Sequence, residues 1–241
     1  MNMMPSPMTT YARVFLLPLI ALCLGVLPPV SVQAQSFDLG ATLTNRYVWR
    51  GLDFGDAAAV QPSLSFSQAG LTIGAWGSFE MSPQAGSAVN ENDLYASYAV
   101  QTSAGTFSVS VTDFYFTNPG SDFFDYSDDG SHVIEPGIGY SGLVSLSASL
   151  NVHGADREVW LEVSYPFTVE EVDLALALGG TPNDGSGYYG TDADTDAAIT
   201  KLSLSASKSI EITDSFSLPL RASYYVNPYL ARSYFLFGIS L

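Results

Sequence analysis

The sequence predicts an all-β fold: a single antiparallel transmembrane β-barrel of about twelve strands, with short periplasmic turns and longer extracellular loops. Three observations predict it. Apolar and polar residues alternate in repeated stretches of about ten residues, which is the length a tilted strand needs to cross a bilayer. No apolar run after residue 35 is long enough for a spanning helix. The connections between the alternating stretches are mostly short at one end and long at the other.

The first 34 residues are set apart from the barrel. Arg13 precedes the apolar run 14–26, and Val32-Gln33-Ala34 supplies small residues for cleavage, a pattern typical of a secretory signal peptide. We therefore assign 1–34 to a signal peptide and 35–241 to the barrel. Cys23, the one cysteine, lies in the first segment. The predicted mature chain thus has no disulfide scaffold and no thiolate metal site.

The first strand is predicted over 37–49. Its odd positions, ending in Tyr47 and Trp49, are mostly apolar and face outward in this interpretation, while its even positions face the interior. Arg46 then lies on the inward face and Arg50 at the rim. Buried charge is costly unless it is paired or hydrated. A structural ion pair and a pore-lining charge are both consistent with this position.

The same alternation predicts eleven further strands. In the fifth strand of the barrel Asp113 falls on the apolar row, so we expect either a bulge near Thr112 or an early end. Aromatic residues near strand ends, Trp49 among them, are predicted to form interfacial girdles. The eleven strands are expected at 60–68, 71–80, 93–101, 106–116, 132–140, 143–153, 157–166, 171–180, 197–209, 215–225 and 231–241. The longest connections are expected at 50–59, 81–92, 117–131 and 181–196.

Several stretches resemble the TorF-type porin family of Gram-negative outer membranes. The specific ones are Asn45-Arg46-Tyr47-Val48-Trp49-Arg50-Gly51, Val60-Gln61-Pro62 and the segment 70–78, and weaker ones follow at 92–95, 114–120 and 133–135. The resemblance covers most of the mature chain and implies a barrel, an outer-membrane location and a channel role with no known substrate. The apolar stretch 54–59 departs from the family pattern, where a more polar loop is expected.

Charge and motifs exclude several function classes. The chain has 24 acidic against 8 basic residues and a net charge of −16, which argues against a nucleic-acid partner. His132 and His153 show no recognisable local arrangement with a serine and a carboxylate, so we expect no enzyme activity. The stretch 192–196 begins like a calcium loop, but Ala197 stands where glycine is wanted and Ser203 where glutamate is wanted. We therefore expect neither a metal site nor a cofactor.

The alternation also divides the inward charges into two groups on opposite walls of the lumen. The predicted basic wall consists of Arg46, Lys201, Arg221 and Arg232. The predicted acidic wall consists of Glu80, Asp93, Glu135, Glu158 and Glu162. Such a lumen would carry a transverse field, and its acidic excess would favour cations weakly.

The expected function is a passive outer-membrane channel for small hydrophilic solutes. The expected partners are outer-membrane lipid, lipopolysaccharide, the barrel-assembly machinery and these solutes. A closed barrel with a structural or surface-binding role through its acidic loops is the alternative. Twelve strands lie between the small barrels that side chains fill and the larger porins with aqueous channels. The number of strands is therefore consistent with both a channel and a closed barrel.

Overall fold

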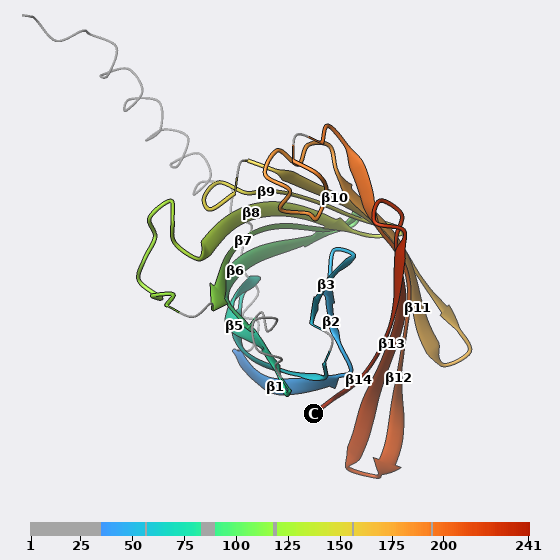
Figure 1. The fold of residues 1–241 in the computed structure, drawn as a ribbon. Coiled ribbons are helices and arrows are strands. Elements are labelled where there is room, and N and C mark those ends of the chain that lie inside the picture. Colours follow the sequence, from blue (N-terminus) through green and yellow to red (C-terminus); the bar gives the residue numbers. More distant parts are fainter. Residues whose placement is uncertain (1–34, 56, 83–89, 118–119, 156, 194) are drawn as a thin grey trace, which may run out of the picture.

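The computed structural model describes residues 35–55, 57–82, 90–117, 120–155, 157–193 and 195–241. The predicted signal peptide, 1–34, lies outside the described residues. Fourteen strands are found in the described part (Figure 1). They are β1 (Ser36–Thr44), β2 (Tyr47–Trp49), β3 (Leu52–Gly55), β4 (Ala59–Gln68), β5 (Leu71–Glu80), β6 (Asn90–Thr102), β7 (Gly105–Thr117), β8 (His132–Ser141), β9 (Ser145–Leu150), β10 (Val159–Val169), β11 (Val172–Thr181), β12 (Ala198–Thr213), β13 (Phe216–Asn227) and β14 (Arg232–Ser240).

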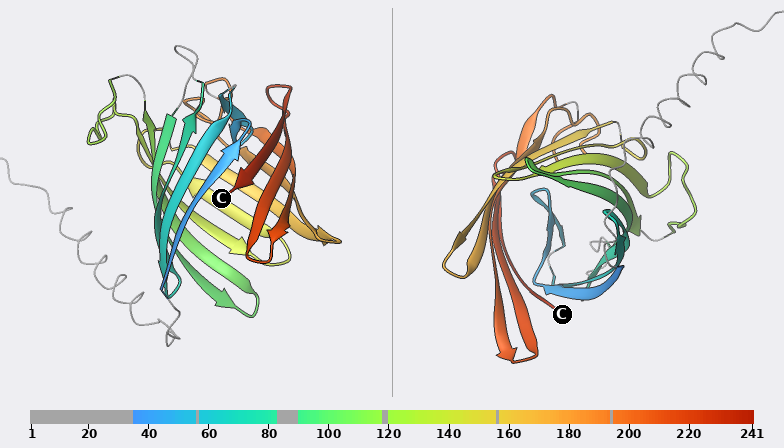
Figure 2. Two further views of the ribbon diagram at one scale, coloured as in Figure 1. Left: turned by 90° about the horizontal axis from the view of Figure 1, so that it is seen from below. Right: turned by 180° about the vertical axis from the view of Figure 1, so that it is seen from behind.

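Twelve of these strands form a closed antiparallel barrel, which confirms the predicted fold class. The order around the barrel is β1-β14-β13-β12-β11-β10-β9-β8-β7-β6-β5-β4, and β4 pairs again with β1. Figure 2 shows the barrel from the side and from behind. Within the described ranges no helix is long and apolar enough to span a membrane.

The two faces of the barrel wall follow the predicted alternation. Leu161, Leu176 and Leu204 are 46%, 50% and 46% exposed on the outer face. The register pairs Leu176 with Leu204 and places Glu162 on the opposite face from Leu161. Glu162 reaches Lys201 across the lumen side of β11. The outer wall is therefore apolar and the inner wall polar.

The barrel closes at a short seam between β1 and β14. Their register covers only Thr42–Thr44, against nine residue pairs between β1 and β4. Asn45 extends the seam with its side chain: its amide Nδ2 donates to the Phe235 carbonyl, and its Oδ1 accepts the Phe237 N–H at 2.7 Å. The Asn45 backbone N–H also donates to the Phe237 carbonyl at 3.0 Å, so the side-chain amide adds to the last backbone hydrogen bond of the seam.

The first strand ends at Thr44, not at residue 49 as predicted. Asn45 gives its side chain to β14, and the chain then turns inward to form the β2–β3 hairpin, residues 47–55, here called the inner hairpin. Figure 1 shows it inside the ring of barrel strands. The inner hairpin is itself extended, so it continues the period of two that the prediction followed. Trp49 accordingly lies in the lumen and not in an outer girdle.

Strand β7 runs to Thr117 without the predicted bulge or early end. Asp113 does face outward, but it is covered by the loop 120–131. The Tyr126 hydroxyl donates to Asp113 at 2.7 Å, and His132 Nδ1 lies 2.8 Å from the same carboxylate. Contacts with Tyr126 of the loop and with His132 at the start of β8, rather than a change of strand phase, satisfy the outward charge.

Candidate functional site

The inner hairpin packs its apolar and aromatic side chains into the half of the lumen next to the long loops. Tyr47 and Val48 are buried. The Trp49 indole meets the ring of Phe114 on β7 edge-on, with 5.6 Å between centroids, and the ring of Tyr188 at 5.7 Å. Phe54 stacks on Tyr47 at 5.4 Å. The apolar character of Phe54, unexpected in a loop, is explained because this residue lies inside the barrel.

The tip of the inner hairpin is a two-residue turn docked against the far wall. Arg50 and Gly51 both have positive φ, 51° and 85°, as a type I′ turn requires. A Cβ on Gly51 would lie 1.8 Å from the Thr200 carbonyl oxygen, so only glycine fits. The Thr200 hydroxyl donates to the Arg50 carbonyl, and Asn227 Nδ2 donates to the Gly51 carbonyl, both at 3.1 Å. The turn is thereby fixed to β12 and β13.

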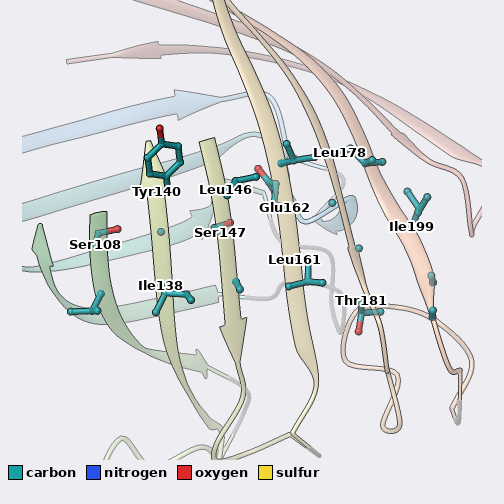
Figure 3. A pocket seen from close by; sticks show the side chains of 18 of the residues that line it. Ser108, Ile138, Tyr140, Leu146, Ser147, Leu161, Glu162, Leu178, Thr181 and Ile199 are labelled. Carbon is teal, nitrogen blue, oxygen red and sulfur yellow. The ribbon is translucent and has the colours of Figure 1, made fainter. Parts of the chain in front are cut away.

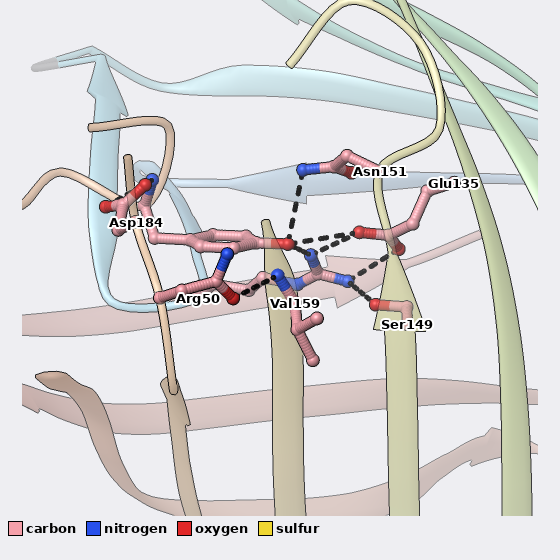
Figure 4. Close-up of polar contacts among 8 residues, drawn as sticks. Arg50, Glu135, Ser149, Asn151, Val159 and Asp184 are labelled. Carbon is pink, nitrogen blue, oxygen red and sulfur yellow. Dashed lines mark hydrogen bonds and ion pairs between the residues drawn. The ribbon is translucent and has the colours of Figure 1, made fainter. Parts of the chain in front are cut away.

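The Arg50 side chain crosses to the opposite strands and ends in a buried ion pair (Figure 4). Its two terminal nitrogens donate to the Glu135 carboxylate at 2.6 and 2.7 Å, and one also donates to Ser149 Oγ at 3.2 Å. The guanidinium lies 4.3 Å from the Trp49 ring centroid and 5.0 Å from that of Trp160. A bidentate pair between aromatic faces is the arrangement in which a buried arginine is best compensated.

The loop after β11 covers the inner hairpin from the long-loop side. Asp184 accepts hydrogen bonds from the backbone N–H groups of Tyr189 and Thr191 and from the Thr191 hydroxyl. Tyr189 is fully buried, and its hydroxyl accepts a hydrogen bond from Arg50 at 3.1 Å. Burial raises the pKa of Tyr189, so the phenol stays neutral beside the ion pair.

Other predicted inward charges are also engaged. Lys201 donates to Glu162 at 2.8 and 2.9 Å, so these two lie together and not on opposite walls. Arg46 pairs with Asp53 of the inner hairpin at 2.6 Å. The prediction of separated walls is wrong for Lys201 and Glu162, because the residue between them on β11 is Gly179, whose lack of a side chain lets them meet.

The remaining predicted residues lie at separate places. Glu80 accepts the Ala57 N–H, and Glu158 accepts the Ser186 N–H at 2.8 Å and the Ser186 hydroxyl. Asp93 is buried on β6. Arg232 is exposed at the rim, and Arg221 lines a cavity beside the inner hairpin. The structure brings Glu135 to Arg50 but does not bring the nine predicted residues into one site.

Sequence reasoning missed two contributors to the lumen. Glu91 is 1% exposed on β6 and faces the same side as Asp93, two residues along. It was assigned to a loop, although one more step of alternation would have included it. The aromatic side chains of the loop after β11, Tyr188 and Tyr189, were also missed. No period marks them, because they belong to a loop whose fold depends on Asp184.

The half of the lumen next to the short turns has a different lining. Its inward positions are mainly small and polar, and many remain partly exposed; examples are Ser65, Ser97, Ser108, Ser145, Ser164 and Ser207. An outer groove of about 980 Å³ lies on the apolar outer face across β7 to β12 (Figure 3). Ile138, Leu161 and Leu178 are among its exposed lining residues. The lumen and this outer groove are separated by the barrel wall.

The chain belongs to the Gcw_chp family, described as bacterial protein of unknown function, whose family model matches residues 31–216. No curated protein matches the chain. The matched segment contains the inner hairpin and its partners Glu135 and Thr200. It therefore includes the Arg50–Glu135 ion pair and the Thr200 hydrogen bond, whereas Asn227, which also holds the turn, lies outside it.

We predict that Arg50→Gln lowers the free energy of unfolding by about 3–5 kcal/mol, because it leaves the Glu135 carboxylate buried without its counter-charge. Guanidinium titration of the refolded protein measures the change. The double variant with Glu135→Gln should lose less than the sum of the two single losses.

The matched control for this cycle is Lys208–Glu171, an exposed pair at 3.0 Å. Its removal should change stability little, because solvent screens an exposed pair. Additive effects of Arg50→Gln and Glu135→Gln would contradict the anchoring role of the buried pair.

Proposed function

We propose that this member of the Gcw_chp family is an outer-membrane channel for small hydrophilic solutes, and that the inner hairpin forms its constriction. The observation that carries the proposal is the composition of the two faces. The wall is apolar outside, with Leu161, Leu176 and Leu204 about half exposed, and polar inside. A barrel with these two faces fits a bilayer around it and water within it.

The lumen near the short turns supports a hydrated vestibule. Its small serine and glycine side chains leave space that larger residues would fill, and their partial exposure allows contact with water. The constriction then lies where Trp49 and Arg50 cross towards Phe114 and Glu135. Solutes that pass it must be small and must tolerate a polar, charged surface.

Weak cation preference follows from the balance of charges around this path. Acidic side chains on the lumen face and the inner hairpin outnumber the basic ones, which are Arg46, Arg50, Lys201 and Arg221. Three of these bases are already neutralised by Asp53, Glu135 and Glu162. The residual potential along the path is therefore negative.

The second candidate is a closed barrel with a structural or surface-binding role. The burial of Tyr47 and Val48 and the complete burial of Tyr189 favour it, because they fill the lumen beside the long loops. In that case the inner hairpin is a permanent part of the core. The function would then depend on contacts of the outer surface with lipid and lipopolysaccharide. Conductance separates the two functions.

We propose transport and no hydrolytic activity. His132 is the residue closest to a catalytic arrangement, since Asp113 lies at its Nδ1. Its Nε2, however, lies 2.7 Å from the Phe123 carbonyl oxygen, and the pair is on the outer face under the loop 120–131. Both ring nitrogens are occupied, so neither is available as a base towards a solute in the lumen.

We predict that the purified protein conducts in planar bilayers and that conductance rises when residues 47–55 are replaced by a short Gly-Ser linker. Removing the inner hairpin takes away the constriction. Under a salt gradient the reversal potential of the parent should indicate cation preference. Substitution of Arg46, Arg221 and Arg232 by Gln should shift it further in the same direction.

The matched control is a variant with a shortened loop 120–131. This loop packs outside the wall, so its loss should leave the conductance unchanged. Absence of conductance in both the parent and the hairpin-deleted variant would exclude the channel and support the closed barrel. Heat-modifiable gel mobility shows whether each variant has folded.

We also predict that Leu176→Arg destabilises the barrel in lipid vesicles by about 2–4 kcal/mol, since a charge on the lipid face at mid-depth must be desolvated. The neighbouring Ala175→Arg is the matched control, because Ala175 faces the lumen. Urea titration of the vesicle-inserted protein measures both. Equal losses would mean that the outer face is not in contact with lipid.

A further inference from the structure

A cavity of about 280 Å³ lies between the inner hairpin and the part of the wall formed by β1, β4, β5, β13 and β14. Its charged and polar lining includes Arg46, Gln61, Arg221 and Tyr225, and its apolar lining includes Trp76 and Leu236. No acidic residue is among the residues that line it. In a chain with a net charge of −16, a cavity with two guanidinium groups and no carboxylate differs from the rest of the lumen.

The two arginines are not equivalent. Arg46 is paired with Asp53 at 2.6 Å. Arg221 makes no ion pair or hydrogen bond with any other residue that the structure describes, and it is exposed on the lumen face of β13. The cavity therefore has a net positive charge. The guanidinium group of Arg221 is planar and can donate two parallel hydrogen bonds to a carboxylate.

The neighbours of Arg221 provide the rest of a small binding site. Gln61 donates one amide hydrogen to Ser78 Oγ at 3.3 Å. Because a side-chain amide has two N–H hydrogens, Gln61 can donate the second one to a ligand. The Trp76 and Leu236 side chains supply an apolar surface for an organic body. The volume falls just below the range of about 300–1,000 Å³ typical of ligand pockets, which restricts the occupant to a small molecule.

We infer that this cavity binds a small organic carboxylate, with its charge on Arg221 and its apolar body against Trp76 and Leu236. The inference goes beyond the proposed channel, because binding requires only that the cavity be reached from the lumen. The ligand would be an anion, whereas the overall charge of the lumen favours cations. The cavity would hold carboxylates selectively beside a path that otherwise disfavours anions.

Calorimetric titration of the full chain, refolded in detergent, with benzoate tests the inference. We expect saturable binding of benzoate, no binding of the neutral benzamide, and a loss of affinity of about tenfold or more in Arg221→Gln, since a charge-assisted bidentate contact disappears. Arg221→Lys, which keeps the charge without the fork, should bind with intermediate affinity.

The matched control is Arg232→Gln, which removes the same charge from the rim of the neighbouring strand without lining the cavity. It should bind benzoate like the parent. Equal losses of benzoate affinity in Arg221→Gln and Arg232→Gln would mean that the arginines act only by long-range attraction. That result would overturn the proposed binding site. Equal affinities for benzoate and benzamide would overturn the assignment of a carboxylate. Because calorimetry requires no ion flow, failure here and failure of the channel proposal are separate results.

Discussion

The ion pair between Arg50 and Glu135 is the constraint on which the inner structure of this barrel depends. Arg50 stands at a positive φ of 51°, a conformation that costs a non-glycine residue about 1–2 kcal/mol. The bidentate pair with Glu135 and the hydrogen bond from Thr200 offset this cost. Because Glu135 is on β8 and Thr200 on β12, one residue ties the inner hairpin to two distant parts of the wall. The position of Trp49 and Tyr189 follows from this anchor.

The inner hairpin divides the lumen into two halves with different physical properties. Beside the long loops, Arg50 and Glu135 form a buried ion pair, and aromatic rings pack around the inner hairpin. Beside the short turns, small serine side chains leave room for water. Arg221 lines the cavity beside the inner hairpin and has no acidic partner among the described residues. The charge separation predicted for the whole lumen is therefore absent where Lys201 meets Glu162, whereas the cavity beside the inner hairpin is lined by two arginines and no carboxylate.

The barrel could be predicted from alternation because the apolar outer face and the polar lumen face of its wall impose a period of two on each strand. The strand 71–80 was predicted with the bounds that the structure has. The inner hairpin could not be predicted in this way, because a strand inside the barrel has the same period as one in its wall. The one local signal of the inner hairpin was the apolar Phe54 in an expected loop. The pairing of Asn45 with β14, which ends the first strand, leaves no local pattern in the sequence. The partners of Arg50 are also distant in sequence, so the choice between a structural and a pore-lining arginine required the fold.

The inward position of the inner hairpin can be measured directly by nuclear magnetic resonance of the refolded protein with labelled aromatic side chains. The ring centroids of Trp49 and Phe114 lie 5.6 Å apart although the residues are far apart in the sequence. The account predicts cross-peaks between these two rings, and their loss in Arg50→Gln. Absence of the cross-peaks in the folded parent protein would place the hairpin outside the lumen and contradict the account.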